Sequence, residues 1–195
     1  DMVERYSRVE MSSKWDLQAK YKAWLRVELA AVKAWNELGL IKKDDCEKIL
    51  KNAKFDIGRI DEIEKTTKHD VIAFLTSVSE NLGAESRFLH YGMTSSDCID
   101  TAVALQVRDS LDLIITDTQN LLKALEKRAF EFKDTLMVGR SHGIHGEPIT
   151  FGLVLAVWFD EIKHALSLLE NAKECISYGK LSGAMGNFAH APLEF

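Results

Sequence analysis

The chain has 195 residues, is 46% hydrophobic and carries a net charge of −5, with an isoelectric point near 5.7. This length can bury roughly 70% of the unfolded chain's surface. The lack of a basic bias argues against a nucleic-acid partner, and no apolar run of about eighteen residues predicts a membrane span. The N-terminus is charged and lacks the apolar stretch of a secretion signal. Three widely spaced cysteines, Cys46, Cys98 and Cys175, fit reduced thiols in a cytoplasmic protein.

A long amphipathic helix is predicted near the start of the chain, from about residue 13 to residue 38. Ser13 and Asp16 have the spacing of a capping box, and apolar residues then recur every three or four positions. Trp24 and Trp35 lie on the apolar stripe of this helix, so we expect them in the core rather than in a ligand site.

Shorter helical patterns follow around residues 45–50, 57–63 and 71–82. Asp70 is expected to cap the last of these helices. His69 and Lys68 then lie where a helix begins, and free N–H groups and positive charge at that point favour an anion. A solvated histidine at a helix start is the alternative interpretation for His69.

Hydroxyl side chains precede the next helix. Gly92 interrupts the local pattern, and Thr94, Ser95 or Ser96 can cap the helix that follows. Hydroxyls at a helix start either cap the backbone or bind phosphate or carboxylate, and the sequence leaves both roles open.

Two long helices are predicted at residues 97–132 and 149–176. At 1.5 Å per residue the first spans about 52 Å, whereas a compact globule of this size is roughly 40 Å across. We therefore expect a helix bundle formed by oligomerisation, a chain that is part of a longer protein, or both.

Residues 139–148 contain three glycines, two histidines, a basic residue and a carboxylate. Each glycine costs about 0.5–1 kcal/mol inside a helix, so the stretch predicts a tight connection on which His142 and His145 converge. Pro148 is expected in the first turn of the next helix. Histidine transfers protons near neutral pH, but two solvated histidines in a plain turn remain an alternative. A metal site would need a third ligand that the spacing does not single out, so no metal is expected.

Four stretches together resemble the adenylosuccinate lyase family of the fumarase/aspartase superfamily, in the same order and at similar spacing. They are residues 5–11 (RYSRVEM), 68–71 (KHDV), 90–97 (HYGMTSSD) and 139–148 (GRSHGIHGEP). The resemblance implies an all-α fold, with an N-terminal helical domain at residues 1–96. Residues 97–195 would then begin the central long-helix bundle, which this chain holds only in truncated form. It also implies a homotetramer whose active sites each draw on three subunits.

The activity implied by the resemblance is a β-elimination that releases fumarate, without cofactor or metal. Adenylosuccinate would give AMP, and succinyl-aminoimidazole-carboxamide ribotide would give its carboxamide ribotide. His142 resembles the general acid that protonates the leaving nitrogen, and His69 a residue that transfers protons or orients the substrate. The implied contacts to phosphate or succinyl carboxylates are Arg5, Tyr6, Lys68, Asp70, His90, Thr94 and Ser95.

The chain departs from the family pattern in small ways and lacks one large feature. Ser141 stands where many members have threonine, and Lys68 stands where close relatives often have arginine. The signature loop that carries the presumed catalytic base lies beyond residue 195, so we expect the chain alone to be inactive. Argininosuccinate lyase or fumarase activity and a non-catalytic helical assembly module are the alternatives. The residues after His142, Gly143-Ile144-His145, favour the adenylosuccinate lyase family, because the other lyases usually have Leu-Gln at that point.

Overall fold

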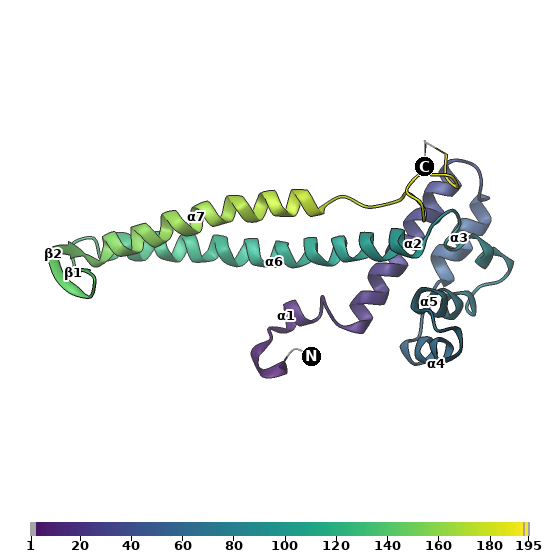
Figure 1. The fold of residues 1–195 in the computed structure, drawn as a ribbon, viewed down its shortest axis with the longest axis horizontal. Helices are drawn as coiled ribbons and strands as arrows, with labels where there is room; N and C mark the ends of the chain where they lie inside the picture. The colour runs from purple at the N-terminus through teal and green to yellow at the C-terminus, as the bar shows by residue number, and fades with distance from the viewer. Residues whose placement is uncertain (1–2, 193, 195) are drawn as a thin grey trace. The chain divides into compact units, whose positions relative to one another are not determined.

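The computed structural model describes residues 3–192 and 194, and helices dominate it (Figure 1). The elements are η1 (Glu4–Tyr6), α1 (Val9–Ser12), α2 (Leu17–Glu37), α3 (Lys43–Asn52), α4 (Ile57–Thr67), α5 (Asp70–Ser79), η2 (Ala84–Phe88), α6 (Ser95–Glu131), β1 (Leu136–Ser141), β2 (Ile144–Thr150) and α7 (Phe151–Ile176). The predicted all-α class is confirmed, since the strands of the described residues form one short antiparallel hairpin. No helix of this described part is long and apolar enough to cross a membrane.

The chain forms two compact units, which we describe separately. The first contains residues 1–107 and 177–195, and the second contains residues 108–176. Helix α6 contributes its first turns to the first unit and its remainder to the second. The domain division expected after residue 96 stays a prediction.

The core of the first unit is built around α2. Trp24 and Trp35 are only 2% and 3% exposed, so the prediction that they belong to the core is confirmed. The ring of Phe74 from α5 stacks on Tyr21 at 5.7 Å and meets Trp24 edge-on at 5.5 Å. Helix α2 begins later than predicted, because Asp16 rather than Ser13 caps it, accepting a 2.6 Å hydrogen bond from the Ala19 N–H.

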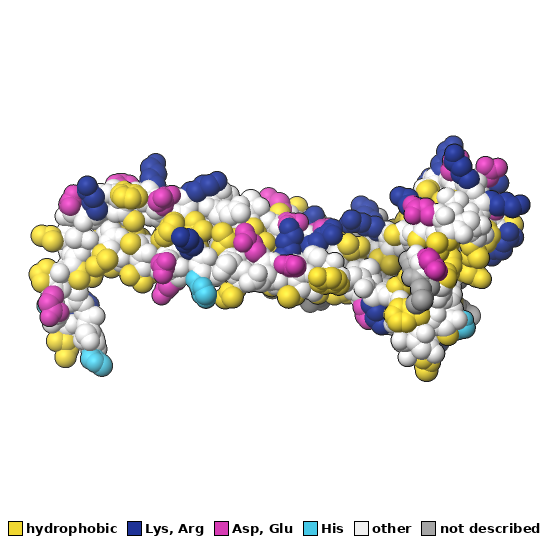
Figure 2. Space-filling model, turned by 90° about the horizontal axis from the view of Figure 1, so that it is seen from above, with side chains coloured by type: hydrophobic (Ala, Val, Ile, Leu, Met, Phe, Trp, Pro, Cys, Tyr) yellow, Lys and Arg dark blue, Asp and Glu magenta, His cyan; other side chains and the backbone are white. Residues whose placement is uncertain are grey.

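The second unit pairs α7 with residues 108–131 of α6 in antiparallel directions, and the bounds predicted for both long helices agree closely with the structure (Figure 1). Lys173 of α7 forms an ion pair with Asp112 of α6. Many apolar side chains of this unit remain exposed, and Figure 2 shows hydrophobic groups on the surface in view. The exposed apolar side chains of this unit include Ile114, Leu121, Phe130, Leu153, Val157, Trp158 and Leu168.

The glycine-rich stretch forms a β-hairpin, which the sequence analysis did not predict. His142 and Gly143 link the strands with φ of +54° and +73°, the positive pair that a type I′ turn requires. The register shifts by one residue after Val138, and a Cβ on Gly139 would lie 2.5 Å from the Glu147 carbonyl oxygen. The prediction for Pro148 is wrong: it pairs with Val138 inside β2, and the helix begins at Phe151.

We expect Gly152→Ala to destabilise the second unit. A Cβ at Gly152 would lie 2.5 Å from the Ala129 carbonyl oxygen and 2.7 Å from the Lys133 Cα, and backbone atoms cannot move aside cheaply. Overpacking of this kind costs about 1–3 kcal/mol, which thermal unfolding of the full-length protein would measure. Gly146→Ala is the matched control, because its Cβ would meet no atom closer than 3.6 Å. Equal midpoints for the two variants would contradict the close packing.

Candidate active site

The junction between α4 and α5 presents Lys68, His69 and Asp70. Lys68 ends α4 in the left-handed conformation (φ 53°), and its N–H donates to the Glu64 carbonyl. The prediction that Asp70 caps this helix is wrong, because His69 is the N-cap of α5. The reason is that the imidazole Nδ1 accepts from the Ile72 N–H at 3.4 Å, while the Asp70 carboxylate accepts from the neighbouring Val71 N–H at 2.8 Å.

This capping bond determines which nitrogen of His69 faces outward. Since Nδ1 acts as an acceptor, the proton of the neutral ring is on Nε2. The His69 side chain is 42% exposed. It therefore caps a helix, a role that the sequence analysis did not assign to it, while presenting an N–H to solvent or a ligand.

His90 is held by Glu28, a residue that the sequence analysis missed. The imidazole Nδ1 lies 2.6 Å from Glu28 Oε1, and the His90 backbone N–H donates to Glu28 Oε2 at 2.8 Å. Glu28 is fully buried. The signal was present in the sequence: Glu28 lies four residues after Trp24 and seven before Trp35, so an acidic residue interrupts the apolar stripe of α2.

The residues after His90 are also attached to α2. The Trp35 indole N–H donates to the Tyr91 carbonyl at 2.9 Å, and the two rings meet edge-on at 5.4 Å. Gly92 has φ of +74°, and a Cβ there would lie 2.9 Å from the Trp35 ring. Helix α2, whose tryptophans the sequence analysis assigned only to the core, therefore fixes the backbone of the segment after His90.

The start of α6 is organised by Asp97, which is fully buried. Its carboxylate accepts hydrogen bonds from the Thr94 N–H at 3.0 Å, the Lys180 ammonium at 2.8 Å and the N–H groups of Ser182 and Gly183 at 3.1 Å. Burial alone would raise the pKa of Asp97, but Lys180 and these three N–H groups outweigh it and lower that pKa. The sequence analysis did not assign this role to Asp97 or Lys180.

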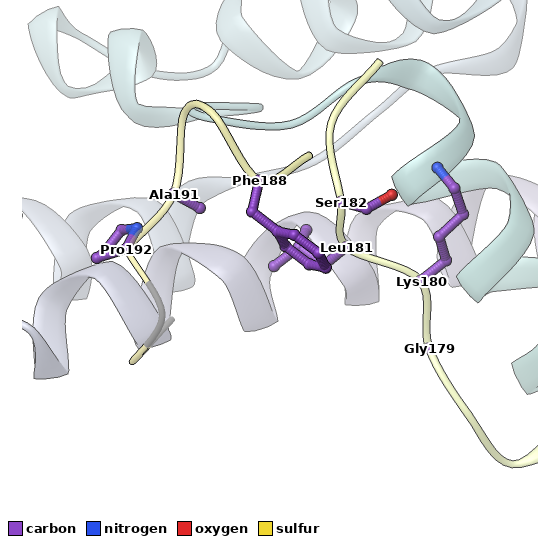
Figure 3. Close-up of a pocket in the computed structure, with 7 residues that line it drawn as sticks. All are labelled: Gly179, Lys180, Leu181, Ser182, Phe188, Ala191 and Pro192. Atoms are coloured by element: carbon purple, nitrogen blue, oxygen red, sulfur yellow. The ribbon is translucent and has the colours of Figure 1, made fainter. Parts of the chain in front are cut away.

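Asp97 thereby joins Thr94 and Ser95 to the segment after α7. The Lys180 ammonium also contacts the Ser96 hydroxyl at 2.8 Å. Figure 3 shows Lys180 and Ser182 directed toward α6, beside an open, mainly apolar pocket. The pocket is lined by Gly179, Lys180, Leu181, Ser182, Phe188, Ala191 and Pro192.

The remaining candidate residues lie on exposed segments. In η1, the Arg5 guanidinium lies 4.8 Å from the centre of the Tyr6 ring, and the Tyr6 side chain is 78% exposed. His142 occupies the hairpin turn of the second unit, and His145 is the second residue of β2; both are exposed. The described residues contain no group of three or more metal-ligating side chains.

The helical fold, with cations and hydroxyls at helix starts and an exposed histidine on a hairpin, suits an enzyme that acts on an anion. The sequence matches the family described as Lyase over residues 5–195, so the chain belongs to this lyase family. It is 62% identical over 193 residues to adenylosuccinate lyase of Helicobacter pylori and 48% identical over 189 residues to that of Bacillus subtilis. These matches cover 99% and 97% of this chain, but 44% of each relative.

Solved structures show the same fold. The chain superposes on a fumarate lyase from Mesorhizobium sp. BNC1 with a TM-score of 0.89 and 28% identity, covering 97% of this chain and 46% of that one. A 3-carboxy-cis,cis-muconate lactonizing enzyme from Pseudomonas putida gives a TM-score of 0.86 and 25% identity, covering 95% and 44%. The resemblance noted in the sequence is confirmed, and the chain spans less than half the length of these relatives.

Proposed function

We propose that the full-length enzyme containing this chain cleaves adenylosuccinate to AMP and fumarate. The observation that carries this proposal is the 62% identity to a relative named adenylosuccinate lyase, extending over 99% of the chain. The same elimination would convert succinyl-aminoimidazole-carboxamide ribotide to its carboxamide ribotide and fumarate. No cofactor is needed, because the step moves only a proton and an electron pair.

The elimination breaks the bond between nitrogen and the succinyl carbon. A base outside residues 1–195 removes a proton from the adjacent carbon, and the electron pair left behind forms the double bond of fumarate. His142 then protonates the departing nitrogen, which leaves far more readily as a neutral group than as an anion. The exposed position of His142 in a hairpin turn is compatible with delivery of a proton to a bound substrate.

Most of the other candidate residues bind the anionic groups in this proposal. Lys68 and His69 lie where α5 begins, and Thr94 and Ser95 lie where α6 begins, so their side chains suit phosphate or carboxylate oxygens. Arg5 and Tyr6, paired on η1, would add a cation and a hydroxyl. Asp70 and His90 complete the set of proposed substrate contacts.

We further propose that the enzyme is a cytoplasmic homotetramer. The exposed apolar side chains on the long helices of the second unit support burial against further copies of the chain, because monomers rarely expose such extended apolar surface.

Fumarate release by the full-length protein tests the activity, with adenylosuccinate and argininosuccinate offered in parallel. We expect cleavage of adenylosuccinate alone. Cleavage of argininosuccinate instead would assign a different lyase activity, and a folded protein that cleaves neither would support a helical assembly module. Residues 1–195 tested alone should be inactive, and activity in that sample would contradict the placement of the base elsewhere.

A further inference from the structure

The carboxylate of Glu28 is bonded at both of its oxygens by His90. Glu28 is 0% exposed, and a charged group buried this deeply destabilises a protein unless donors compensate it. Its donors are the ring Nδ1 and the backbone N–H of His90. Burial, followed by the charge of Glu28, raises the pKa of the neighbouring Cys98 thiol, which stays protonated and donates to the Trp24 carbonyl at 3.7 Å.

This arrangement determines where the hydrogen of the His90 ring lies. The backbone N–H donates to one carboxylate oxygen, so Glu28 is an acceptor there, and the 2.6 Å contact at the other oxygen is satisfied when Nδ1 carries a hydrogen. The second ring nitrogen, Nε2, has no hydrogen-bond partner among the described residues. The His90 side chain is 19% exposed, so a ligand can reach it.

The His90 ring is also fixed before any ligand arrives. The backbone of His90 has φ of +59°, a conformation that non-glycine residues seldom adopt. The two bonds to Glu28 and the attachment of Tyr91 to Trp35 hold it there. A side chain ordered in advance loses less freedom on binding.

We propose that Glu28 is a positioning residue that holds His90 with Nε2 toward the substrate. An anionic oxygen of the substrate, either of the phosphate or of a succinyl carboxylate, then shares a hydrogen bond with Nε2. This inference rests on the proposed function, and it assigns to α2 a part in binding that none of the four motifs contains.

Steady-state kinetics of Glu28→Gln in the full-length enzyme test the inference. The amide oxygen of glutamine can accept only one of the two hydrogen bonds from His90, and the amide nitrogen cannot accept the other. We expect KM for adenylosuccinate to rise about tenfold while kcat changes by less than about threefold, the pattern of lost binding. A purely structural role would lower the amount of active enzyme, and hence kcat, at unchanged KM. Glu37→Gln, an exposed acid on the same helix, should alter neither.

A double-mutant cycle shows whether Glu28 acts through His90. In a His90→Ala background, Glu28→Gln should change KM by less than about twofold, because the group that it positions is gone. An effect as large as in the wild-type background would overturn the inference. If Glu28→Gln fails to fold, Glu28→Asp keeps the charge but cannot span both bonds, and the same rise in KM is expected.

Binding of the two products gives a test that does not need catalysis. Calorimetric titration of AMP and of fumarate into the full-length protein should show weaker binding of one product, by about tenfold, in both Glu28→Gln and His90→Ala. The weakened product identifies phosphate or carboxylate as the group bound. If the wild-type protein binds the products but does not cleave adenylosuccinate, the proposed activity is wrong, but the role of Glu28 in binding is not contradicted. Unchanged binding in Glu28→Gln, or no binding of either product by wild type, would overturn the inference.

Discussion

Replacement of His142 by alanine in the full-length enzyme is expected to lower kcat for adenylosuccinate by about 10²–10⁴-fold, the usual contribution of a positioned acid. The nitrogen would otherwise have to leave as an anion. KM should change much less, because His142 is proposed to act on the transition state rather than to hold the substrate. The measurement is fumarate release at saturating and at limiting substrate.

His164→Ala provides the matched control for this result. His164 is exposed on α7 of the same unit and is not a candidate for the site, so its removal should leave kcat within about twofold of wild type. A His142→Ala enzyme that retains wild-type kcat would contradict the assignment of the acid. It would also revive the interpretation of His142 as a solvated residue in a turn.

The second large effect concerns stability: Asp97→Asn is expected to destabilise the first unit by about 3 kcal/mol. The asparagine would leave the Lys180 ammonium without its counter-charge and would offer too few acceptors for the N–H groups of Ser182 and Gly183. Breaking a buried pair costs about 3–5 kcal/mol, and the lower end applies because the Lys180 side chain is 39% exposed. Urea unfolding of the full-length protein measures this, with exposed Asp100→Asn as the control.

The effect of Asp97 should depend on pH in a defined direction. Folding lowers the pKa of Asp97 below the value of about 3.9 found in unfolded chains. The unfolded state therefore takes up the proton first as the pH falls, so the stabilisation is complete above about pH 4 and is lost as the pH falls through the folded-state pKa. The difference between wild type and Asp97→Asn should thus be constant near pH 7 and shrink in acid. A difference that grows in acid would contradict the ion pair.

Local periodicity was sufficient to predict most of the helical fold. The bounds of α6 and α7 were predicted to within two residues, and Trp24 and Trp35 were assigned to the core. An apolar stripe is a property of neighbouring residues and can be recognised without knowing what covers it. Capping was predicted less well, because two polar residues lie near the start of each helix, Ser13 and Asp16 for α2 and His69 and Asp70 for α5, and the sequence does not show which of the two is the N-cap.

The sequence by itself determined the helices, their buried faces and the four motifs that point to a lyase. Only the tertiary structure revealed the β-hairpin, where Gly139 approaches the Glu147 carbonyl across the strands. It also brought Glu28 to His90, 62 residues away, and Lys180 to Asp97, 83 residues away. The physical reason is that periodicity reports which face of a helix is buried. The partner of a buried charge is set by how distant segments pack, which no local pattern contains.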